Sequence, residues 1–555
     1  MKTPLLILFI FVIGFRCSKS SDTQVTPPVI PSNFNLSSLS VDGITSQAFY
    51  RDITISPTIK FKFPTAINRN SVSGSILLKD NAGSIVSYNT TYDNDSVVVI
   101  TPASPLSYFT KYNLSISTAL KSTAGGSLKS STQINFVTVL DSSDKFSRIS
   151  DDALLNLIQQ QTLKYFTDFA HPVSGMARER NSSGDVVTTG GTGFGVMSII
   201  TGISRNFISR TDGLTQVTKI VNFLKNNCTS YHGAFSHWIN GTTGATVPFS
   251  TKDDGADVVE TSYLLEGLLC ARQFFNGVDV AESDLRNNIN FLWNRVEWNW
   301  FRQNNQNVLY WHWSPNYSWD MNFQIKGWNE AMIVYALAAS SNTDSIPKIV
   351  YDNGWASNGG IKNGNAYYGY TLPLGPALGG PLFFSHYSFL GINPKRLSDN
   401  YADYNIQTIN HSKINYTYCV NNPKGYYGYS SSCWGLTASD EQNGYSAHAP
   451  DNDNGTITPT AAISSLPYTP VESINALKFF YYTLGDKIWK QYGFADAFNL
   501  TDIWFADSFL AIDQGPEIIM IENYRTSLLW NLFMSCPEVK RGMRQLGFQS
   551  PDLSP

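Results

Sequence analysis

The feature that most constrains the fold is a change in the spacing of apolar residues near residue 145. Before it, short alternating or β-rich runs such as TIKFKF, SVVVIT and QINFVTV are separated by clusters of Pro, Gly, Asn and Asp. A two-residue period of this kind predicts strands, and about seven strands without a helical stretch indicate a β-sandwich over 33–140. After the segment LDSSDKFSRIS, apolar residues recur every three to four positions, which is the helical period.

The helical period predicts a large second domain over 148–550. The pattern indicates about twelve helices, alternately more polar and more apolar. An outer ring of amphipathic helices around an inner ring of apolar ones buries such a series compactly, so we expect a mainly α fold with an (α/α)6 barrel. The predicted helices span 151–170, 192–205, 212–227, 256–276, 282–297, 327–341, 343–352, 380–390, 400–418, 457–464, 470–491 and 515–534.

Charge and composition narrow the class of ligand. The 555 residues are enough for two domains, and the formal net charge is −4, from 39 basic and 43 acidic residues without a basic block. Nucleic acid is therefore not an expected partner. Charged residues make up 15% of the chain and aromatic residues 14%, a profile that suits stacking on neutral carbohydrate. Large helical cores also use aromatic residues, so most of these rings are expected in the core.

The N-terminus, MKTPLLILFIFVIGFRCSKSSD, is typical of an export signal. A basic Lys2 precedes an apolar segment of about a dozen residues, which is too short to span a bilayer. Cys17 follows it as in the lipidation sites of bacterial lipoproteins, although Arg16 stands where a small residue is usual. We expect a signal peptide over 1–17 and a flexible linker over 18–32. The chain is then exported to the periplasm or cell surface and anchored to the outer membrane by a lipid on Cys17, a modification that Arg16 leaves open.

No sequence pattern indicates a metal ion or another cofactor. The cysteines form no C-x-x-C motif and no Cys/His cluster with zinc spacing, and the seven histidines are scattered. The segment DNDNG at 451–455 lacks the spacing and the closing Glu of a calcium loop. Cys419 and Cys433 flank a loop and could close a disulfide in an oxidising compartment.

The segment TKDDGADVVETSYLLEGLL crowds acids in front of an apolar helix. Because a helix turns about 100° per residue, Asp253, Asp257 and Glu260 share one stripe with Leu264 and Leu268, the side expected to face the core. Acids in a first turn often only cap free N–H groups. That explanation covers Asp257 and Glu260 less well, because they lie a turn further in, so a catalytic or sugar-binding role is the competing prediction.

Further acids are predicted at the N-termini of other inner helices. Glu330 in GWNEAMIVYALA opens one of them, and Asp513 and Glu517 in AIDQGPEIIMIENY open the last. Asp440 lies in the loop WGLTASDEQNGYSAHAP before another. The loops into the inner helices of such a barrel line one mouth, where these carboxylates are expected to converge. An acid that protonates a leaving oxygen and a base that activates water are what glycoside hydrolysis requires.

Six longer segments carry a resemblance to a known family. They are DDGADVVETSYLLEGLL, GWNEAMI, PLFFSHYSFLGINP, GLTASDEQNGYSAHAP, PTAAISSLPYTP and AIDQGPEIIMIENYRTSLLW. They closely resemble the glucoamylase-like glycoside hydrolases of Bacteroidetes, a group that includes endo-β-1,2-glucanases of glycoside hydrolase family 144. The resemblance covers 148–550 and implies an (α/α)6 fold and hydrolysis with inversion. It attaches catalytic and substrate-binding importance to Asp253, Asp257, Glu260 and Glu330.

Roles for single residues follow from this resemblance and from the predicted mouth of the barrel. We expect Glu330 to be the general acid, and Asp257 or Glu260 to hold the water or the sugar hydroxyls. Asp440 and Asp513 are the alternative bases, although each could equally be a loop or capping carboxylate. The expected sugar contacts, each more often structural when taken alone, are Asp253, Arg178, Trp328, His386, Tyr387, Trp434, Tyr468 and Glu517.

The expected function is that of an exported enzyme that cleaves β-linked glucan, with β-1,2-glucan as the first choice. A β-glucosidase or another glucosidase of the same fold is one alternative, and a non-catalytic surface glycan-binding lipoprotein is another. The strand-rich region resembles the bacterial Ig-like modules found ahead of secreted enzymes and contains none of the candidate acids. We expect a monomer whose partner is an oligo- or polysaccharide.

Overall fold

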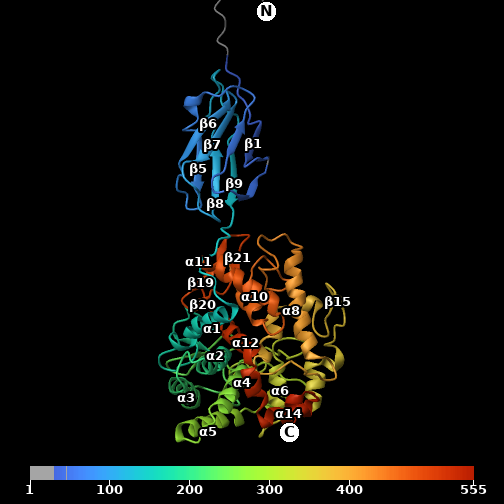
Figure 1. The fold of residues 1–555 in the computed structure, drawn as a ribbon. Coiled ribbons are helices and arrows are strands. Elements are labelled where there is room, and N and C mark those ends of the chain that lie inside the picture. Colours follow the sequence, from blue (N-terminus) through green and yellow to red (C-terminus); the bar gives the residue numbers. More distant parts are fainter. Residues whose placement is uncertain (1–29, 46, 555) are drawn as a thin grey trace, which may run out of the picture. The chain divides into compact units, whose positions relative to one another are not determined.

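The computed structural model describes residues 30–45 and 47–554 (Figure 1). The chain divides between Asp141 and Ser142 into two compact units. The expected export signal, Cys17 and most of the expected linker over 18–32 lie outside the described residues. Within the described part, no helix combines the length and the apolar character needed to cross a membrane.

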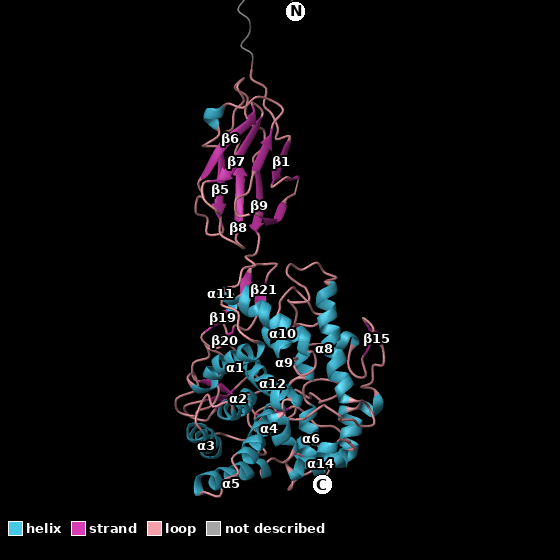
Figure 2. Ribbon diagram, viewed as in Figure 1, coloured by secondary structure: helices cyan, strands magenta, loops and turns pink. Residues whose placement is uncertain are grey.

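The first unit is a β-sandwich of nine described strands (Figure 2). One sheet has the order β2 (Ile44–Thr45), β1 (Ser38–Val41), β4 (Ile59–Lys62), β7 (Val97–Pro102), β6 (Tyr88–Asn94). The other has the order β3 (Phe49–Ile53), β9 (Thr132–Thr138), β8 (Lys111–Ile116), β5 (Ile76–Asp80), with β3 parallel to β9 and the remaining pairs antiparallel.

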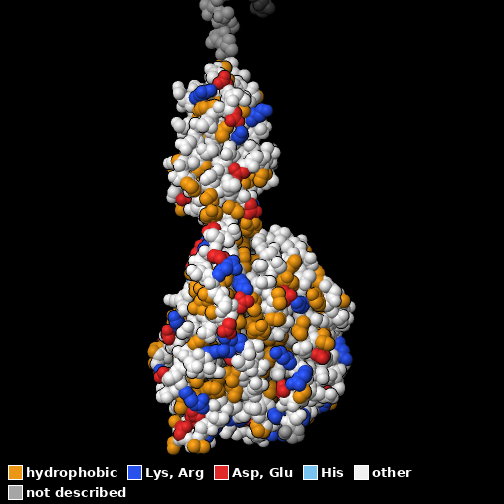
Figure 3. All heavy atoms as spheres, in the orientation of Figure 1, with side chains coloured by type: hydrophobic (Ala, Val, Ile, Leu, Met, Phe, Trp, Pro, Cys, Tyr) orange, Lys and Arg blue, Asp and Glu red, His pale blue; other side chains and the backbone are white. Residues whose placement is uncertain are grey.

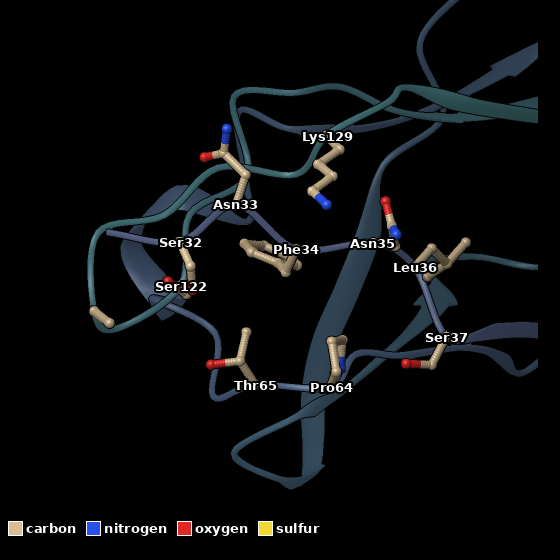
Figure 4. A pocket seen from close by; sticks show the side chains of 11 residues that line it. Ser32, Asn33, Phe34, Asn35, Leu36, Ser37, Pro64, Thr65, Ser122 and Lys129 are labelled. Atoms are coloured by element: carbon tan, nitrogen blue, oxygen red, sulfur yellow. The ribbon is translucent and has the colours of Figure 1, made fainter. Parts of the chain in front are cut away.

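The sandwich core follows from the alternation of the strands. In β4, Ile59 and Phe61 are fully buried whereas Lys60 and Lys62 are exposed, as a half-buried strand requires. A pocket of about 530 Å³ lies in this unit (Figure 4). Lys129 is the only titratable side chain among its eleven lining residues, so this pocket holds no acid for hydrolysis.

The second unit is a helical barrel, which confirms the fold class expected from the sequence (Figure 2). Its inner elements are almost entirely buried, and α2 packs between α4 and α12. The inner elements are α2 (Thr189–Ser204), α4 (Val258–Phe274), α6 (Met332–Ser340), the 3₁₀ turns η6 (Leu382–Ser385) and η7 (Tyr387–Phe389), α9 (Pro459–Ser464) and α12 (Ala511–Thr526).

The outer elements alternate with the inner ones along the chain. They are α1 (Asp151–Thr167), α3 (Arg210–Asn226), α5 (Val280–Asn294), α7 (Lys348–Val350), α8 (Tyr404–Asn421) and α10 (Pro470–Lys478), followed by α11 (Gly485–Ile488), α13 (Leu528–Met534) and α14 (Pro537–Leu546). Short strands join them: β10 (Val186–Thr188), β11 (Trp238–Asn240), β12 (Thr246–Val247), β13 (Ala256–Asp257), β14 (His312–Trp313), β15 (Ala366–Tyr367), β16 (Tyr370–Thr371), β17 (Ala438–Glu441), β18 (Gly444–Ala447), β19 (Trp489–Lys490), β20 (Gly493–Phe494), β21 (Phe498–Asn499) and β22 (Trp504–Phe505).

Several predicted helices differ from the observed ones. The helix expected over 343–352 is the short α7 followed by a π-helical turn over Tyr351–Trp355, and the helix expected over 470–491 is divided into α10, a π-helical turn over Phe479–Thr483 and α11. The helix expected over 327–341 begins only at Met332, because the side chain of Asn329 accepts the N–H of Ala331 and forms a turn there. The helix expected over 380–390 is the pair of 3₁₀ turns η6 and η7, in a run of aromatic and Ser residues that form helices weakly. The helix expected over 515–534 is two helices, α12 and α13, which meet at Ser527 with φ at 60°.

Glycines set how closely α2 and α4 approach. A Cβ atom on Gly193 would lie 2.1 Å from the carbonyl oxygen of Tyr263, and one on Gly267 would lie 2.2 Å from the carbonyl oxygen of Gly193. The two backbones are therefore in direct contact, which no larger residue permits.

The described cysteines form no disulfide. All five cysteines that the structure describes are free thiols, including the buried Cys419 and Cys433, so the disulfide considered for that pair does not form here.

On the face shown in Figure 3, Lys and Arg side chains are interspersed with Asp and Glu side chains over the helical unit. This face offers no large patch of one sign for a polyanion.

Candidate active site

A cavity of about 430 Å³ opens at the N-terminal ends of the inner helices. Its wall combines carboxylates with aromatic rings, as a sugar-binding site requires. The lining residues are Glu179, Arg180, Thr188, His237, Trp238, Phe249, Glu260, Tyr263, Trp311, Glu330, Phe383, Tyr387, Ala438, Tyr445, Ala447, Leu510 and Ile512.

Glu330 lies in the turn before α6 and lines this cavity. Its backbone carbonyl accepts hydrogen bonds from the hydroxyl of Tyr263, at 3.4 Å, and from the hydroxyl of Ser388, so the turn is fixed on two sides. Burial, and then the charges of Asp257 and Glu260, raise the pKa of Glu330 to about 7. A carboxyl group that keeps its proton near neutral pH is suited to general acid catalysis.

Glu260 lies in the first turn of α4 and lines the same cavity. Its Oε2 accepts the N–H of Gly190, at 2.7 Å, and the hydroxyl of Thr188, at 3.3 Å. Burial, together with the charge of Asp257, raises the pKa of Glu260, whereas the positive ring of His237 and these two donors oppose the shift. The donors therefore stabilise the carboxylate form that a catalytic base needs.

Asp257 is the N-cap of α4, which corrects the expectation that capping ends before it. Its Oδ1 accepts the N–H groups of Val259 and Glu260, both at 2.9 Å. Its Oδ2 lies 3.2 Å from Nδ1 of His237 and 3.7 Å from Nε2 of His312. Burial opposes its charge, but the hydrogen bond from His237 and the two rings hold the pKa of Asp257 below its ordinary value. Asp257 is thus ionised, although it is fully buried and does not line the cavity.

Asp253 precedes β13 and is not on the helix, so the predicted stripe with Asp257 and Glu260 is wrong for this residue. Its Oδ2 lies 3.4 Å from Nε2 of His312. Burial and the neighbouring charge of Asp257 raise the pKa of Asp253 to about 7. We call Asp253, Asp257, Glu260 and Glu330 the Glu330 group.

A second set of acids lies nearby, and we call Asp440, Asp496, Asp513 and Glu517 the Asp513 group. Asp440 forms an ion pair with Nη1 of Arg180, with both oxygens at 3.1 Å, and its N–H donates to Oδ2 of Asp496. Burial and neighbouring carboxylates raise the pKa of Asp496 to about 7 and that of Asp513 well above its ordinary value. Burial also raises the pKa of Glu517. None of these four belongs to the described lining of the cavity.

Four of the expected sugar contacts are core residues instead. Trp328 packs against Trp355, Phe389 and Tyr404. Trp434, His386 and Tyr468 are also buried: Trp434 packs against Tyr416, and His386 stacks on Tyr468 and lies 3.0 Å from the hydroxyl of Ser465. These large rings fill the spaces between helices, which is where the composition placed most aromatic residues.

Arg178 also lies outside the cavity lining. Its guanidinium lies 5.1 Å from the ring of Phe169 and donates to the carbonyls of Phe169 and Gly184. Arg180, two residues on, lines the cavity in its place. Of the expected sugar contacts, Tyr387 alone belongs to the described lining.

Several lining residues were not singled out from the sequence. His237, Trp238 and Phe249 come from the segment around β11 and β12, and Tyr445 comes from the β17–β18 hairpin. Tyr445 falls within GLTASDEQNGYSAHAP, which resembles the family, and that segment was the one signal that could have found it. The fold and the cavity together are those of a glycoside hydrolase built on a helical barrel.

Comparison with known proteins narrows this class. Residues 322–537 match the family model described as "Putative glucoamylase", and residues 37–138 match the model of a bacterial Ig-like domain. The chain is 45% identical over 420 residues to the exo β-1,2-glucooligosaccharide sophorohydrolase (non-reducing end) of Parabacteroides distasonis. This match covers 72% of the chain but only 58% of the length of that relative.

Two solved structures share the fold. The endo-β-1,2-glucanase of Chitinophaga pinensis, in complex with sophorotriose and glucose, is 51% identical with a TM-score of 0.72, over 73% of this chain and 100% of that one. A β-1,2-glucanase of Parabacteroides distasonis is 37% identical with a TM-score of 0.70, over 94% of this chain and 74% of that one. The chain therefore belongs to the glucoamylase-like family of glycoside hydrolases, as the sequence motifs indicated.

Proposed function

We propose that the chain is an exported glycoside hydrolase that cleaves β-1,2-linked glucan with inversion. The observation that carries this proposal is that Glu330 and Glu260 line one cavity: burial raises the pKa of Glu330 to about 7, and the carboxylate of Glu260 accepts hydrogen bonds from the N–H of Gly190 and the hydroxyl of Thr188. The β-1,2 linkage is supported by the names of the relatives, which are a β-1,2-glucooligosaccharide sophorohydrolase and β-1,2-glucanases.

In this mechanism Glu330 donates its proton to the glycosidic oxygen as the bond to the anomeric carbon breaks. A water molecule attacks that carbon from the opposite face, and Glu260 accepts the proton of the water, directly or through a sugar hydroxyl. Asp257 does not reach the cavity, and its charge holds His237 in place through a hydrogen bond of 3.2 Å. The two acids end in exchanged protonation states, which solvent resets.

Asp440 and Asp513 remain the alternative bases, but their surroundings favour the role less. Both oxygens of Asp440 are engaged by Nη1 of Arg180, and Asp440 does not belong to the described lining of the cavity. Asp513 is buried, and its raised pKa favours the protonated form. Glu260 lines the cavity and accepts two hydrogen bonds that favour its carboxylate form, so it is the better base among the described acids.

Aromatic rings supply the sugar platforms in this proposal. The rings of Trp238 and Phe249 lie 4.7 Å apart in the wall, Phe383 and Tyr387 stack on each other at a ring distance of 5.3 Å, and Trp311 also lines the cavity. Flat apolar faces of this kind pack on the C–H faces of glucose rings, while Arg180 and Glu179 offer charged partners for hydroxyl groups.

The test is digestion of β-1,2-glucan, β-1,3-glucan, starch and small β-glucosides, with reducing ends followed over time. We expect release from β-1,2-glucan, and the product sizes to separate endo from exo action. Release only from small β-glucosides would favour a β-glucosidase of the same fold. No release from any substrate, with tight binding of β-1,2-glucan by calorimetry, would favour a glycan-binding lipoprotein instead.

We also propose that the chain is exported, anchored through a lipid on Cys17, and active as a monomer. The support is the apolar segment that precedes Cys17 and the resemblance of this position to lipidation sites. Replacing Cys17→Ser should move the protein from the membrane fraction to the soluble fraction. Light scattering of the protein lacking residues 1–29 should give the mass of one chain.

A further inference from the structure

A second hollow, of about 650 Å³, adjoins the cavity. The cavity and this hollow share Arg180 and Tyr445 as lining residues, so they meet at these two side chains. The segment 504–508, which begins with Trp504 in β22, also lines the hollow. A sugar chain that extends from the cavity past Tyr445 therefore enters it. We call it the Trp504 hollow.

Hydrogen bonds fix the walls of the Trp504 hollow. The side chain of Asn181 donates to the carbonyl of Asp507 at 3.0 Å and accepts the N–H of Phe509 at 3.1 Å. The guanidinium of Arg180 donates to both oxygens of Asp440 at 3.1 Å. The hollow is therefore preorganised, so a ligand that binds there loses little free energy in ordering its walls.

Trp504 differs from the other tryptophans in having a free ring. Every other tryptophan of the chain contacts an aromatic ring or a cation. Within the described part of the chain no aromatic ring or cation contacts Trp504, which is half-buried and held by the pairing of its backbone with Asn499. A fixed, half-buried ring without a partner offers a flat apolar face to a ligand.

The polar groups of the Trp504 hollow suit a neutral ligand. The side chains of Gln442 and Ser182 line it and form no hydrogen bond with other described residues. Its charged groups are paired instead, Arg180 with Asp440 and Asp507 with Lys490. Free amide and hydroxyl groups beside an apolar ring are suited to the hydroxyl groups and the C–H face of a sugar.

We propose that the Trp504 hollow is a further sugar-binding subsite, occupied by the same glucan chain whose scissile bond lies in the cavity. This inference rests on the proposed function and makes Trp504 a residue that determines the preferred chain length. A chain that reaches Trp504 gains a stacking contact that a disaccharide confined to the cavity lacks. The sequence did not indicate this role, because Trp504 lies outside the segments that resemble the family.

The test measures how affinity for β-1,2-linked oligosaccharides grows with chain length. Calorimetry uses the full chain carrying Glu330→Gln, which limits cleavage, with and without Trp504→Ala or Trp504→Phe. KM and kcat are measured for the same Trp504 substitutions in the active chain. The matched control is Tyr524→Ala, because Tyr524 is 38% exposed, lies at the C-terminal end of α12 and lines neither the cavity nor the Trp504 hollow.

We expect affinity to rise with chain length until the chain reaches Trp504. Trp504→Ala should weaken binding of the longest chains by at least about fivefold and raise KM more than it lowers kcat, with a smaller loss for shorter chains. Trp504→Phe should keep part of the affinity, and Tyr524→Ala should keep all of it.

An undiminished gain in affinity with chain length in folded Trp504→Ala protein would overturn the subsite. The proposed function would then still stand if the active chain cleaves β-1,2-glucan. Absence of both binding and cleavage at every chain length in the folded protein would overturn the subsite and the proposed function together.

Discussion

The Glu330 group and the Asp513 group contain four buried or half-buried acids each, yet only the first supplies groups to the cavity. Glu260 and Glu330 line it, whereas the described lining includes no member of the Asp513 group. Asp257 is stabilised by histidines and N–H groups, while Asp440 is held by Arg180. The comparison teaches that counting the acids at a barrel mouth does not show where the reaction takes place. The catalytic acids are identified by whether they line the cavity and by which groups they bond to.

The two groups also differ in one pKa value. In the Glu330 group burial raises the pKa values of Asp253, Glu260 and Glu330, whereas His237 and His312 hold the pKa of Asp257 below its ordinary value in spite of burial. In the Asp513 group the pKa values of Asp496, Asp513 and Glu517 are all raised. The one lowered pKa belongs to Asp257, which does not line the cavity but holds His237 in the cavity wall through a hydrogen bond of 3.2 Å.

The largest expected effect comes from Glu330→Gln, which keeps the side-chain volume and removes the transferable proton. We predict that kcat on β-1,2-glucan falls by at least about 100-fold. The matched control is Glu266→Gln, because Glu266 is also buried with a raised pKa but does not line the cavity. Near-normal kcat in folded Glu330→Gln would show that Glu330 is not the general acid. The Glu330 group would then have no demonstrated catalytic advantage over the Asp513 group.

The next effect is that of pH on the wild-type enzyme. Because the pKa of Glu330 is raised to about 7, the group is protonated below that pH and loses its proton above it. We predict that kcat declines above pH 7 and is about tenfold lower at pH 8. Initial rates between pH 5 and 9, with circular dichroism at each pH, measure this. A constant kcat between pH 6 and 9 would contradict the assignment.

A smaller effect is expected for Asp513→Asn. Burial raises the pKa of Asp513, which favours its neutral form, and Asp513 does not line the cavity, so the amide is a close substitute in shape and charge. We predict a decline in kcat of less than about tenfold, below the range of a lost catalytic base. A loss as large as that of Glu330→Gln would instead identify Asp513 as the base.

Glu517→Gln should act on stability and not on turnover. Burial raises the pKa of Glu517 above its value in the unfolded chain, so the folded state keeps a proton that the unfolded state releases. Its contribution is complete below the unfolded pKa and is lost as pH rises, by at most about 1.4 kcal/mol per pH unit. Urea unfolding at several pH values from 5 to 8 should show a flatter dependence in the variant. Identical slopes would show that Glu517 is not buried as an acid.

The smallest effect is expected from removal of residues 1–141, the whole first unit. The candidate acids all lie in the second unit, so kcat on soluble glucan should stay within about twofold of the full chain. Assays of the shortened protein, after its folding is checked by circular dichroism, measure this. A folded but inactive product would give the sandwich a role in turnover.

The anomeric configuration of the fresh product tests the roles given to Glu330 and Glu260. In inversion the acid and the base act on opposite faces of the sugar, so NMR of fresh products should show the inverted anomer first. Retained configuration would require a covalent intermediate and would reject the roles given to Glu330 and Glu260.

Periodicity predicted the architecture better than it predicted the site. The alternation of Ile59 and Phe61 with lysines predicted β4, and the apolar run after Val258 predicted α4. The turn that carries Glu330 was not predicted, because the helical period continues through it, and the side chain of Asn329 delays the start of α6 to Met332.

Single residues were predicted less well than the elements that carry them. Trp328 and Trp434 were expected in the wall and are in the core, since a sequence shows that a ring is large but not which side of a loop it faces. Arg180 lines the cavity in place of Arg178, because the guanidinium of Arg178 donates instead to the carbonyls of Phe169 and Gly184.

The glycine contact between α2 and α4 limits how this enzyme could be redesigned. A Cβ atom on Gly190 would lie 2.7 Å from Oε2 of Glu260, and the contact of Gly193 with Tyr263 is closer still. The floor of the cavity therefore has no tolerance for an added methyl group, even at positions that never meet the sugar. Libraries that aim at new glucan linkages should leave these helices untouched and vary the β17–β18 hairpin and the segment around Phe249.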